Sequence, residues 1–178
     1  MRICIFHSQL TAKIAASLLP PSPGRDAATI AGLLHDVGKL ILATRSPHQF
    51  ARAIQGARVD KLPLYVVEQK LMGVSHAEVG AYLLGLWGLP APVVEAVAHH
   101  HAPGKIPSSA LDAVGAVHIA NVLANEHPVY PPAKDSLPHQ SMDTEFLEAL
   151  GIAEQVPRWE EAAKTAAQSL RSPATVAR

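Results

Sequence analysis

The sequence predicts an all-α fold, and three observations carry that prediction. Apolar residues recur at helical spacing along most of the 178-residue chain. The alternation of apolar and polar residues that is typical of strands is almost absent, and aromatic residues make up only 4% of the composition. With 48% hydrophobic residues, the chain is long enough for one domain with its own core and too short to favour two.

Helical spacing and turn-forming residues together divide the chain into nine predicted helices. PPSPG at 20–24 ends the first, Pro47 opens the third, and Gly88-Leu89-Pro90 separates the fifth from the sixth. Ser75 and Ser108 stand where an N-cap side chain would satisfy free backbone N–H groups. In chain order, the predicted helices cover 3–19, 25–43, 47–57, 61–72, 75–87, 91–101, 108–125, 143–150 and 157–171.

The first of these helices needs its own argument, because MRICIFHSQLTAKIAASLL could be mistaken for a signal sequence. His7, Gln9 and Lys13 interrupt the apolar run, while Leu10 and Ile14 recur at helical spacing. We therefore expect an amphipathic helix that begins abruptly.

Glycine and tryptophan positions predict how the helices pack. Gly32, Gly38 and Gly80 lie inside predicted helices, where each costs about 1 kcal/mol against alanine. We interpret them as sites of close helix approach, although tolerated defects are an alternative. Trp87, with Leu86 and Leu89, is expected to pack in the core.

The domain boundaries follow from one irregular stretch. Residues 127–142, HPVYPPAKDSLPHQSM, are rich in proline and polar residues, which predicts a loop rather than a helix. We expect one helical domain over 1–126, this loop over 127–142, and helices within 143–178 that pack on the same domain.

Charge and cysteine content argue against several classes of protein. Fifteen Lys and Arg balance fifteen Asp and Glu, so we predict no DNA partner. The only cysteine, Cys4, has no intrachain disulfide partner and suits a reducing cytoplasm, where we place the protein. No uninterrupted apolar run approaches the roughly 20 residues that cross a bilayer, so no membrane association is expected.

Histidines are the chemical signal of this composition, which contains ten of them. An ionised Asp36 in the apolar stretch AGLLHDVGKL needs a cation, a metal or several hydrogen-bond donors beside it. Lys39 lies one turn after His35, where its ammonium could contact an anionic ligand or shield Asp36. Imidazole and carboxylate together suit iron, manganese or zinc. Alternatively, each histidine is a core side chain hydrogen-bonded to a carbonyl.

The order of the motifs resembles one known family. HSQLTAKIAASL, AGLLHDVGKLIL, EQKLMGVSHAEVGAYLLGLWGLPAPVVEAV, HHHAP and VHIANVLA, which together cover about residues 3–126, resemble the HDOD branch of the HD-domain superfamily of helical metal-dependent phosphohydrolases. The related HD-GYP branch of cyclic-dinucleotide phosphodiesterases has an acidic Gly-Tyr-Pro loop where this chain has APGKIP. The resemblance therefore implies an HD-domain-like multi-helix bundle.

The same resemblance implies a set of site residues. Asn121 stands where the superfamily has aspartate, and its uncharged amide should lower metal affinity. Glu68 matches a further carboxylate of some relatives, and His118 is expected in the core or behind the ligands. We take Asp36 and Lys39 as the candidate catalytic residues. The implied cofactor is a divalent metal, Fe, Mn or similar, which is present as a binuclear pair, as a single ion or not at all. Its implied ligands are His7, His35, Asp36, His76, His100, His101 and Asn121.

Three functions stay open at this point. The resemblance favours a bacterial signal-transduction module that keeps a metal-site skeleton without being an enzyme and that acts through protein partners or as a homodimer. The second is a metal-dependent phosphohydrolase acting on a nucleotide or cyclic dinucleotide. The third is a purely structural bundle. Because such modules have helices before the first motif, we expect this chain to be the second part of one, with an apolar face that favours a dimer or partner.

Overall fold

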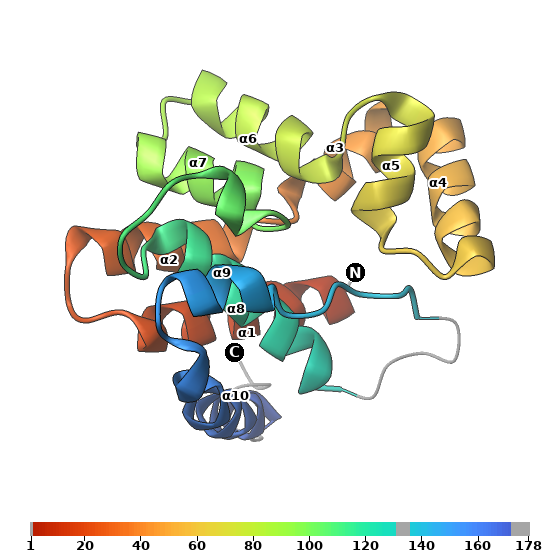
Figure 1. Ribbon diagram of the computed structural model, residues 1–178. Helices are drawn as coiled ribbons and strands as arrows, with labels where there is room; N and C mark the ends of the chain where they lie inside the picture. Colours follow the sequence, from red (N-terminus) through yellow and green to blue (C-terminus); the bar gives the residue numbers. More distant parts are fainter. Residues whose placement is uncertain (1, 131–135, 172–178) are drawn as a thin grey trace.

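The computed structural model describes residues 2–130 and 136–171, with side chains from residue 5 onward. Parts of the predicted loop and of the predicted C-terminal segment, residues 131–135 and 172–178, lie outside the described residues. The described chain is a bundle of helices without a strand, which confirms the all-α prediction (Figure 1). The helices are α1 (Arg2–Leu18), α2 (Pro23–Leu34), α3 (Val37–Arg45), α4 (Pro47–Asp60), α5 (Leu64–Met72), α6 (His76–Leu86), α7 (Ala91–His99), α8 (Ala113–Glu126), α9 (Thr144–Ala149) and α10 (Val156–Arg171), with short 3-10 turns η1 (Pro103–Lys105) and η2 (Ala153–Gln155).

The main core surrounds α8, in which every residue from Ala113 to Ala124 is buried. A helix that is apolar on all sides needs neighbours all round, and α1, α2, α7 and α10 supply them. Leu10 and Ile14 of α1 are completely buried there, and Trp159 of α10 belongs to the same core.

A second, smaller core lies between α4 and α5, which form a hairpin beside the main bundle (Figure 1). Ala53 and Ala57 of α4 face Leu64 and Val67 of α5, and Leu137 of the irregular segment packs against them. Helix α3 joins this hairpin to the bundle, since it packs on both α4 and α6.

The predicted single helix over 25–43 is wrong at its centre, where the chain breaks into α2 and α3 at His35 and Asp36. Asp36 has φ −98° and ψ 6°, outside the helical region. The His35 ring donates from Nδ1 to the carbonyl oxygen of Gly32 at 2.8 Å, so a side chain satisfies a helix-end carbonyl. Apolar residues continue on both sides of the break, and for that reason the periodicity did not reveal it.

One stretch within the described residues, Pro23–Arg45, is long and apolar enough in composition to cross a membrane. This stretch consists of α2 and α3, with the break at His35 and Asp36 between them. Helix α2 packs on α1, α7 and α8, and core helices of globular proteins can be equally long and apolar. The stretch is therefore weak evidence for a membrane span.

Two glycines permit the close helix contacts that the sequence predicted. A Cβ atom at Gly38 would collide with the carbonyl oxygen of His76, and one at Gly32 would lie 2.7 Å from the Cα atom of Ala12. Gly38 thereby brings α3 against the start of α6, where His76 lies. These positions confirm the close-approach interpretation.

The prediction for Trp87 is wrong, because its side chain is 64% exposed and that of Leu86 is 67% exposed. The buried face of α6 consists mainly of small residues and Leu84, and the chain turns at Gly88, which has φ 75°. Trp87 therefore remains on the outer side of this turn, and only Leu89 packs against the core.

One of the two predicted N-caps is present. Ser75 forms a capping box with Glu78 at the start of α6, as expected. Ser108 is not a cap, because α8 begins later, at Ala113, where Asp112 accepts a hydrogen bond from the backbone N–H of Gly115. The prediction is therefore confirmed for Ser75 and wrong for Ser108.

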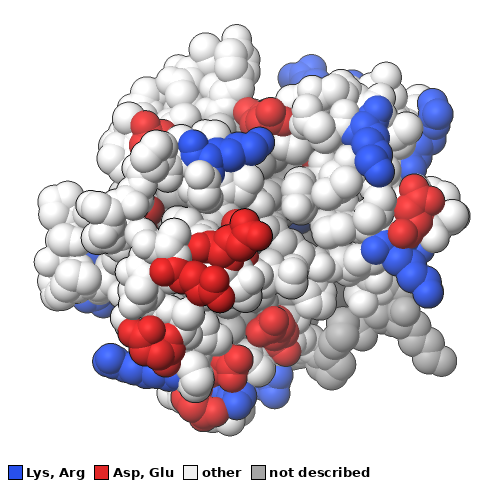
Figure 2. Space-filling view, viewed as in Figure 1, with Lys and Arg blue, Asp and Glu red and all other residues white. Residues whose placement is uncertain are grey.

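Charges that cancel in the composition are separated in space. Residues 37–73, which include α3, α4 and α5, carry six Lys and Arg against two acidic residues, and residues 143–171 carry six acidic residues against three basic ones. Figure 2 shows the blue side chains gathered over the α4–α5 side and the red ones over the side of α9 and α10. The side of the molecule that carries α3 to α5 therefore favours an anionic ligand.

Candidate metal centre

The residues predicted as metal ligands come from five separate parts of the chain and converge on one place. His7 lies on α1 and Asn121 on α8, 114 residues apart, yet His7 Nε2 is 3.0 Å from Asn121 Oδ1. The others lie at helix ends: His35 and Asp36 at the α2–α3 break, His76 at the first residue of α6, and His100 and His101 directly after α7. Helix ends lack regular backbone partners and let adjacent side chains turn towards one site.

Three of these side chains form the His7 group: His7, His35 and Asp36. Their possible ligand atoms all lie within 4.8 Å of one another. The Nε2 atoms of His7 and His35 are 3.3 Å apart, and His35 Nε2 is 3.6 Å from Asp36 Oδ2. His35 is completely buried, whereas the Asp36 side chain is 21% exposed.

Three further imidazoles form the His100 group: His76, His100 and His101. Their possible ligand atoms also lie within 4.8 Å of one another. The Nε2 atoms of His76 and His101 face each other at 3.0 Å, and the ring centroids of His100 and His101 are 3.9 Å apart. His76 and His100 are almost completely buried.

Asp36 stands between the two groups. Its Oδ2 atom lies towards His35, and its Oδ1 atom lies 3.3 Å from Nε2 of His76. Lys39 donates to Oδ2 at 2.6 Å. Of the two roles considered for Lys39, the structure shows the shielding of Asp36.

Hydrogen bonds at Nδ1 fix the ring protons of His76 and His100. Glu68 is completely buried, and its Oε2 atom accepts from Nδ1 of His76 at 2.6 Å and from the His76 backbone N–H at 2.8 Å. The carbonyl oxygen of Val97 accepts from Nδ1 of His100 at 2.8 Å. Because both Nδ1 atoms donate, the neutral rings carry their lone pairs at Nε2, inside the group. Glu68 thus stands behind a ligand, in contact with His76, rather than among the ligands.

The proton of His101 is fixed by a residue that the sequence analysis did not single out. The Gln140 amide donates from Nε2 to the His101 carbonyl oxygen at 2.7 Å, so its Oε1 atom is the acceptor for His101 Nδ1–H, also at 2.7 Å. Tyr65 stacks on the same ring with centroids 4.1 Å apart. No sequence signal marked Gln140, because it lies in the stretch predicted only as a loop.

The His7 group has a different internal arrangement. The Asn121 Oδ1 atom accepts from Asn125 Nδ2 at 3.2 Å and from His7 Nε2 at 3.0 Å, so the proton of neutral His7 lies at Nε2. That proton faces the lone pair of His35 Nε2, because His35 donates from Nδ1. The His7 group is therefore hydrogen-bonded within itself.

Burial and neighbouring charges shift the pKa values of these residues. Burial, with the nearby His35, lowers the pKa of His7 to about 4. Burial also lowers the pKa of His35, and it lowers the pKa values of His100 and His101 well below their ordinary range. These four imidazoles are consequently neutral at pH 7, which is the form that binds metals.

The carboxyl group of Asp36 responds in the opposite sense. Burial alone would raise its pKa, but the charge of Lys39, together with the neighbouring His35 and His76, outweighs burial and holds the pKa well below its usual value. Asp36 is therefore an anion at neutral pH, and the centre combines one carboxylate with several neutral imidazoles.

This set of side chains fits a divalent cation. Nε2 of His100 is buried without a hydrogen-bond partner among the described residues, and the facing Nε2 atoms of His76 and His101 have no proton between them when both rings are neutral. Metal–nitrogen bonds of about 2.1 Å put neighbouring ligand atoms about 3.0–3.4 Å apart, which is the separation seen here. The groups could therefore hold a metal.

His118 lies behind the centre, as expected. It is completely buried, donates from Nδ1 to the carbonyl oxygen of His100 at 3.0 Å, and accepts at Nε2 from the backbone N–H of Asp143 at 3.1 Å. Both nitrogens are used, so His118 has no lone pair for a metal and serves to hold the His100 backbone in place.

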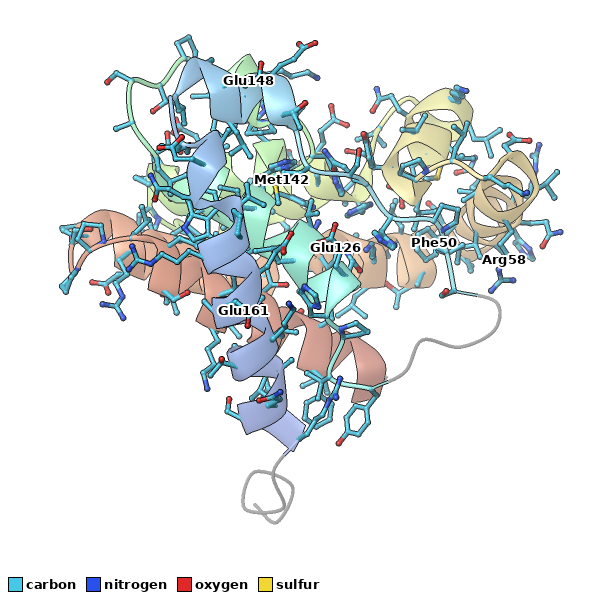
Figure 3. The ribbon with its side chains drawn as sticks, turned by 60° about the horizontal axis from the view of Figure 1, so that its bottom comes forward. Phe50, Arg58, Glu126, Met142, Glu148 and Glu161 are labelled. Atoms are coloured by element: carbon cyan, nitrogen blue, oxygen red, sulfur yellow. The ribbon has the colours of Figure 1, made fainter. Side chains whose placement is uncertain are left out.

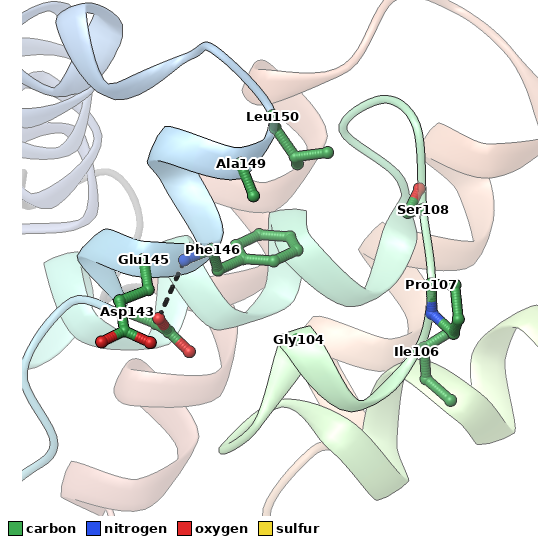
Figure 4. Close-up of a pocket in the computed structure, with 9 residues that line it drawn as sticks. All are labelled: Gly104, Ile106, Pro107, Ser108, Asp143, Glu145, Phe146, Ala149 and Leu150. Atoms are coloured by element: carbon green, nitrogen blue, oxygen red, sulfur yellow. Dashed lines mark hydrogen bonds between the residues drawn. The ribbon is translucent and has the colours of Figure 1, made fainter.

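A surface pocket of about 340 Å³ lies elsewhere, between the chain after α7 and helix α9 (Figure 4). Asp143 Oδ1 accepts the backbone N–H of Phe146 at its edge, as the dashed line shows. None of the predicted metal ligands lines it. The lining residues are Gly104, Ile106, Pro107, Ser108, Asp143, Glu145, Phe146, Ala149 and Leu150.

Comparison with known proteins gives one family match and several similar structures. A model of the HDOD domain matches residues 5–103. The crystal structure of an HDOD domain protein with unknown function from Geobacter sulfurreducens is similar with a TM-score of 0.67 and 22% identity, over 94% of this chain and 57% of that one. A "Putative signal transduction protein" from Marinobacter aquaeolei VT8 gives a TM-score of 0.64 and 22% identity, over 94% and 39%.

Two further proteins extend the comparison. A "Putative phosphohydrolase" from Shewanella amazonensis SB2B has a TM-score of 0.61 and 21% identity, over 93% of this chain and 62% of that one. An uncharacterized protein from Treponema pallidum (strain Nichols) is 26% identical over 152 residues, which are 80% of this chain and 26% of that protein. This chain therefore spans less than two thirds of each protein, and the structural likeness at these identities shows the fold.

Proposed function

Because this chain belongs to the HDOD domain family, as its motifs predicted, we propose that it is a bacterial signal-transduction module built around a divalent-metal centre, and that it is not an enzyme. One observation carries the metal part of this proposal: within residues 2–130 and 136–171, the buried Nε2 atom of His100 has no hydrogen-bond partner, and it lies beside the facing Nε2 atoms of His76 and His101. Such an arrangement is costly without a cation to share.

The His100 group, with Oδ1 of Asp36, would hold a first ion, and the His7 group, with Asn121 and Oδ2 of Asp36, would hold a second. When bound, an ion such as Mn²⁺ or Fe²⁺ would supply positive charge and Lewis acidity at this place. Since the ligands come from α1, the α2–α3 break, α6, the end of α7 and α8, binding would also cross-link these helices, which is a way to couple the centre to the shape of the module.

The non-enzymatic part of the proposal rests on how the centre is covered. Lys39 occupies the Asp36 oxygen that faces the His7 group, and Asn121 brings no charge to it. His35, His76 and His100 have almost no exposed surface. A phosphate substrate would need access to these buried nitrogens, whereas the partly exposed side chains of Asp36 and Lys39, at 21% and 35%, are paired with each other.

A metal-dependent phosphohydrolase acting on a nucleotide or cyclic dinucleotide is the second candidate. Two observations favour it: the carboxylate of Asp36 is placed to serve both groups, and the partly exposed ammonium of Lys39 lies beside it, within the stretch 37–73 that is rich in Lys and Arg. In this alternative Lys39 would leave Asp36 and bind a phosphate oxygen of the substrate.

Metal analysis followed by a hydrolysis assay distinguishes these functions. The protein is purified without added metal, its metal content is measured by mass spectrometry, and a generic phosphodiester is then offered with Mn²⁺. Bound metal without turnover is the expected result. Turnover that His35→Ala and Asp36→Ala each abolish would replace the first function by the second, and a chain that binds no metal contradicts both.

The role of a signalling module also implies a cytoplasmic location and action through a protein partner or as a homodimer. The net charge of zero lets two copies approach without repulsion. Light scattering of the purified protein over a range of concentrations tests the homodimer directly. A monomer at all concentrations would leave a partner protein as the proposal.

A further inference from the structure

The stretch that the sequence predicted only as a loop crosses the candidate metal centre. We call residues 137–143 the strap. Its first residue, Leu137, packs in the small core between α4 and α5, and Met142 packs against the main core. Figure 3 shows the strap running from Met142 towards Phe50 of α4. The strap therefore joins the two cores, and its middle passes beside the His100 group.

Two contacts hold the middle and the end of the strap at the centre. Both amide atoms of Gln140 are engaged by one residue, His101, at 2.7 Å each. Three positions further on, the backbone N–H of Asp143 donates to Nε2 of His118, whose Nδ1 in turn donates to the carbonyl oxygen of His100. The strap is thus connected to both histidines that follow α7.

The Gln140 contact decides which nitrogen of His101 carries the proton. The amide cannot be reversed, because its NH₂ group already donates to the His101 carbonyl oxygen, so the oxygen faces Nδ1 and requires a proton there. The lone pair of His101 then lies at Nε2. Tyr65 stacks on the ring and keeps its plane fixed while this bond forms.

Without that acceptor, the proton of His101 would be more stable at Nε2 than at Nδ1. Nε2 of His76 lies 3.0 Å from Nε2 of His101, and its lone pair points into the group because His76 Nδ1 donates to Glu68. A proton moved to Nε2 of His101 would therefore form a hydrogen bond to His76. That single bond would occupy two of the three Nε2 atoms of the His100 group.

We propose that Gln140 is a positioning residue of the metal centre: it holds the proton of His101 at Nδ1 and so prevents His76 and His101 from pairing with each other. The inference rests on the proposed metal-binding function. Residues that hold the far nitrogen of a ligating histidine typically contribute 10- to 100-fold in metal affinity. Here the residue comes from an irregular segment, and both cores hold that segment in place.

The test compares three variants in the full chain. Gln140→Met keeps the length of the side chain and removes both amide atoms, whereas Gln140→Glu keeps an oxygen acceptor for Nδ1 and loses only the NH₂ donor to the His101 carbonyl oxygen. Ser141→Ala is the matched control, since Ser141 is the exposed neighbour in the strap. The proton position of His101 is read in metal-free, ¹⁵N-labelled protein from the imidazole nitrogen shifts, and Mn²⁺ affinity is measured separately by calorimetry.

The unaltered chain, Gln140→Glu and Ser141→Ala should all show the Nδ1–H form of His101. Gln140→Met should shift His101 towards the Nε2–H form and bind Mn²⁺ about 10- to 100-fold more weakly, while Gln140→Glu stays within a few-fold of the unaltered chain. A loss of affinity in Gln140→Met with an unchanged proton position would overturn the inference, as would an Nε2–H form in the unaltered protein or in Gln140→Glu.

The two readouts separate the inference from the function on which it rests. If the unaltered chain binds no Mn²⁺ although His101 carries its proton at Nδ1, the proposed metal function fails and the role of Gln140 in fixing the ring stands. If Gln140→Met does not fold, Gln140→Glu still decides, because its acceptor must preserve the Nδ1–H form.

Discussion

The His7 group and the His100 group offer similar atoms to a cation, but they differ in how those atoms are occupied. In the His7 group, the proton of His7 faces Asn121 and His35, and Lys39 neutralises the nearby oxygen of Asp36. In the His100 group, each Nδ1 is bound to an acceptor outside the group, and the three lone pairs face inward.

This difference shows that the convergence of ligand residues is not sufficient to form a metal site. A group that has satisfied its own hydrogen bonds must lose them before it binds an ion, so part of the binding free energy is spent on that exchange. A group with inward lone pairs and bound outer nitrogens has little to rearrange. We therefore expect the first divalent ion at the His100 group, and weaker binding at the His7 group.

The largest expected effect comes from removing one ligand in each group. His100→Leu and His7→Leu are a matched pair that keeps a similar volume in the two sites. His100→Leu should weaken binding of the first Mn²⁺ by at least about 100-fold, because a direct ligand contributes more than an outer partner does. His7→Leu should change the affinity for the first Mn²⁺ by less than about threefold. Calorimetric titration gives both affinities, and equal losses in the two variants would end the distinction between the groups.

Acid should destabilise the metal-free chain. The folded-state pKa of His7 is about 4 against 6.5 in the unfolded chain, so the unfolded state binds more protons between these values. The contribution of His7 to the free energy of unfolding is therefore fully present above about pH 6.5 and is lost as the pH falls towards 4, and it is at most about 3.5 kcal/mol at about 1.4 kcal/mol per pKa unit. His100 and His101, whose pKa values lie well below the ordinary range, extend the loss to lower pH.

Urea unfolding of the metal-free protein between pH 7.5 and 4.5 measures this effect. In the same samples, NMR titration should show His7 protonated before His100 as the pH falls, which sharpens the contrast between the groups. The pKa of Asp36 is lowered, so its contribution is present above about pH 3.8 and does not produce the slope between pH 4.5 and 6.5. A free energy of unfolding that stays constant down to pH 4.5 would contradict the prediction.

The sequence predicted the helices and the set of residues that converge because both leave local patterns. Apolar spacing marks α1 and α10, and a histidine beside an aspartate in an apolar stretch is chemically unusual wherever it occurs. The break at His35 and Asp36 left no such pattern, since it depends on a hydrogen bond from a ring to a carbonyl three residues earlier. The outward position of Trp87 depends likewise on the turn at Gly88.

The proton positions at the centre could not be predicted for a different reason. They depend on contacts between residues distant in the sequence, such as Gln140 with His101, 39 positions apart, and His7 with Asn121, 114 apart. A loop of prolines and polar residues gives no register from which such a contact follows. The sequence therefore indicated which atoms are available to a metal, and the fold decides which of them are free.

A substitution at Glu68 should have a smaller effect on Mn²⁺ affinity, confined to the His100 group. Glu68→Gln keeps an oxygen acceptor for Nδ1 of His76 but removes the negative charge that strengthens this ligand. We expect the first Mn²⁺ to bind about 10-fold more weakly, with no effect on binding at the His7 group. Glu148→Gln, which neutralises an exposed carboxylate on α9, is the control. An equal loss in both variants would point to general charge rather than to the contact with His76.

The last expected effect, of similar size and opposite sign, is a gain in the weaker group. Asn121→Asp places a carboxylate against His7, where the present amide offers only a neutral oxygen. A charged oxygen attracts a cation and no longer depends on the proton of His7, so binding of the second Mn²⁺ should strengthen by about 10-fold, a typical 1–1.5 kcal/mol for one added charge near a partly buried ion. The first ion should be affected less than threefold. Gln9→Glu adds the same charge on the exposed face of α1, two residues after His7, and if it strengthens the second ion equally, the gain comes from the field of the added charge and not from a ligand at position 121.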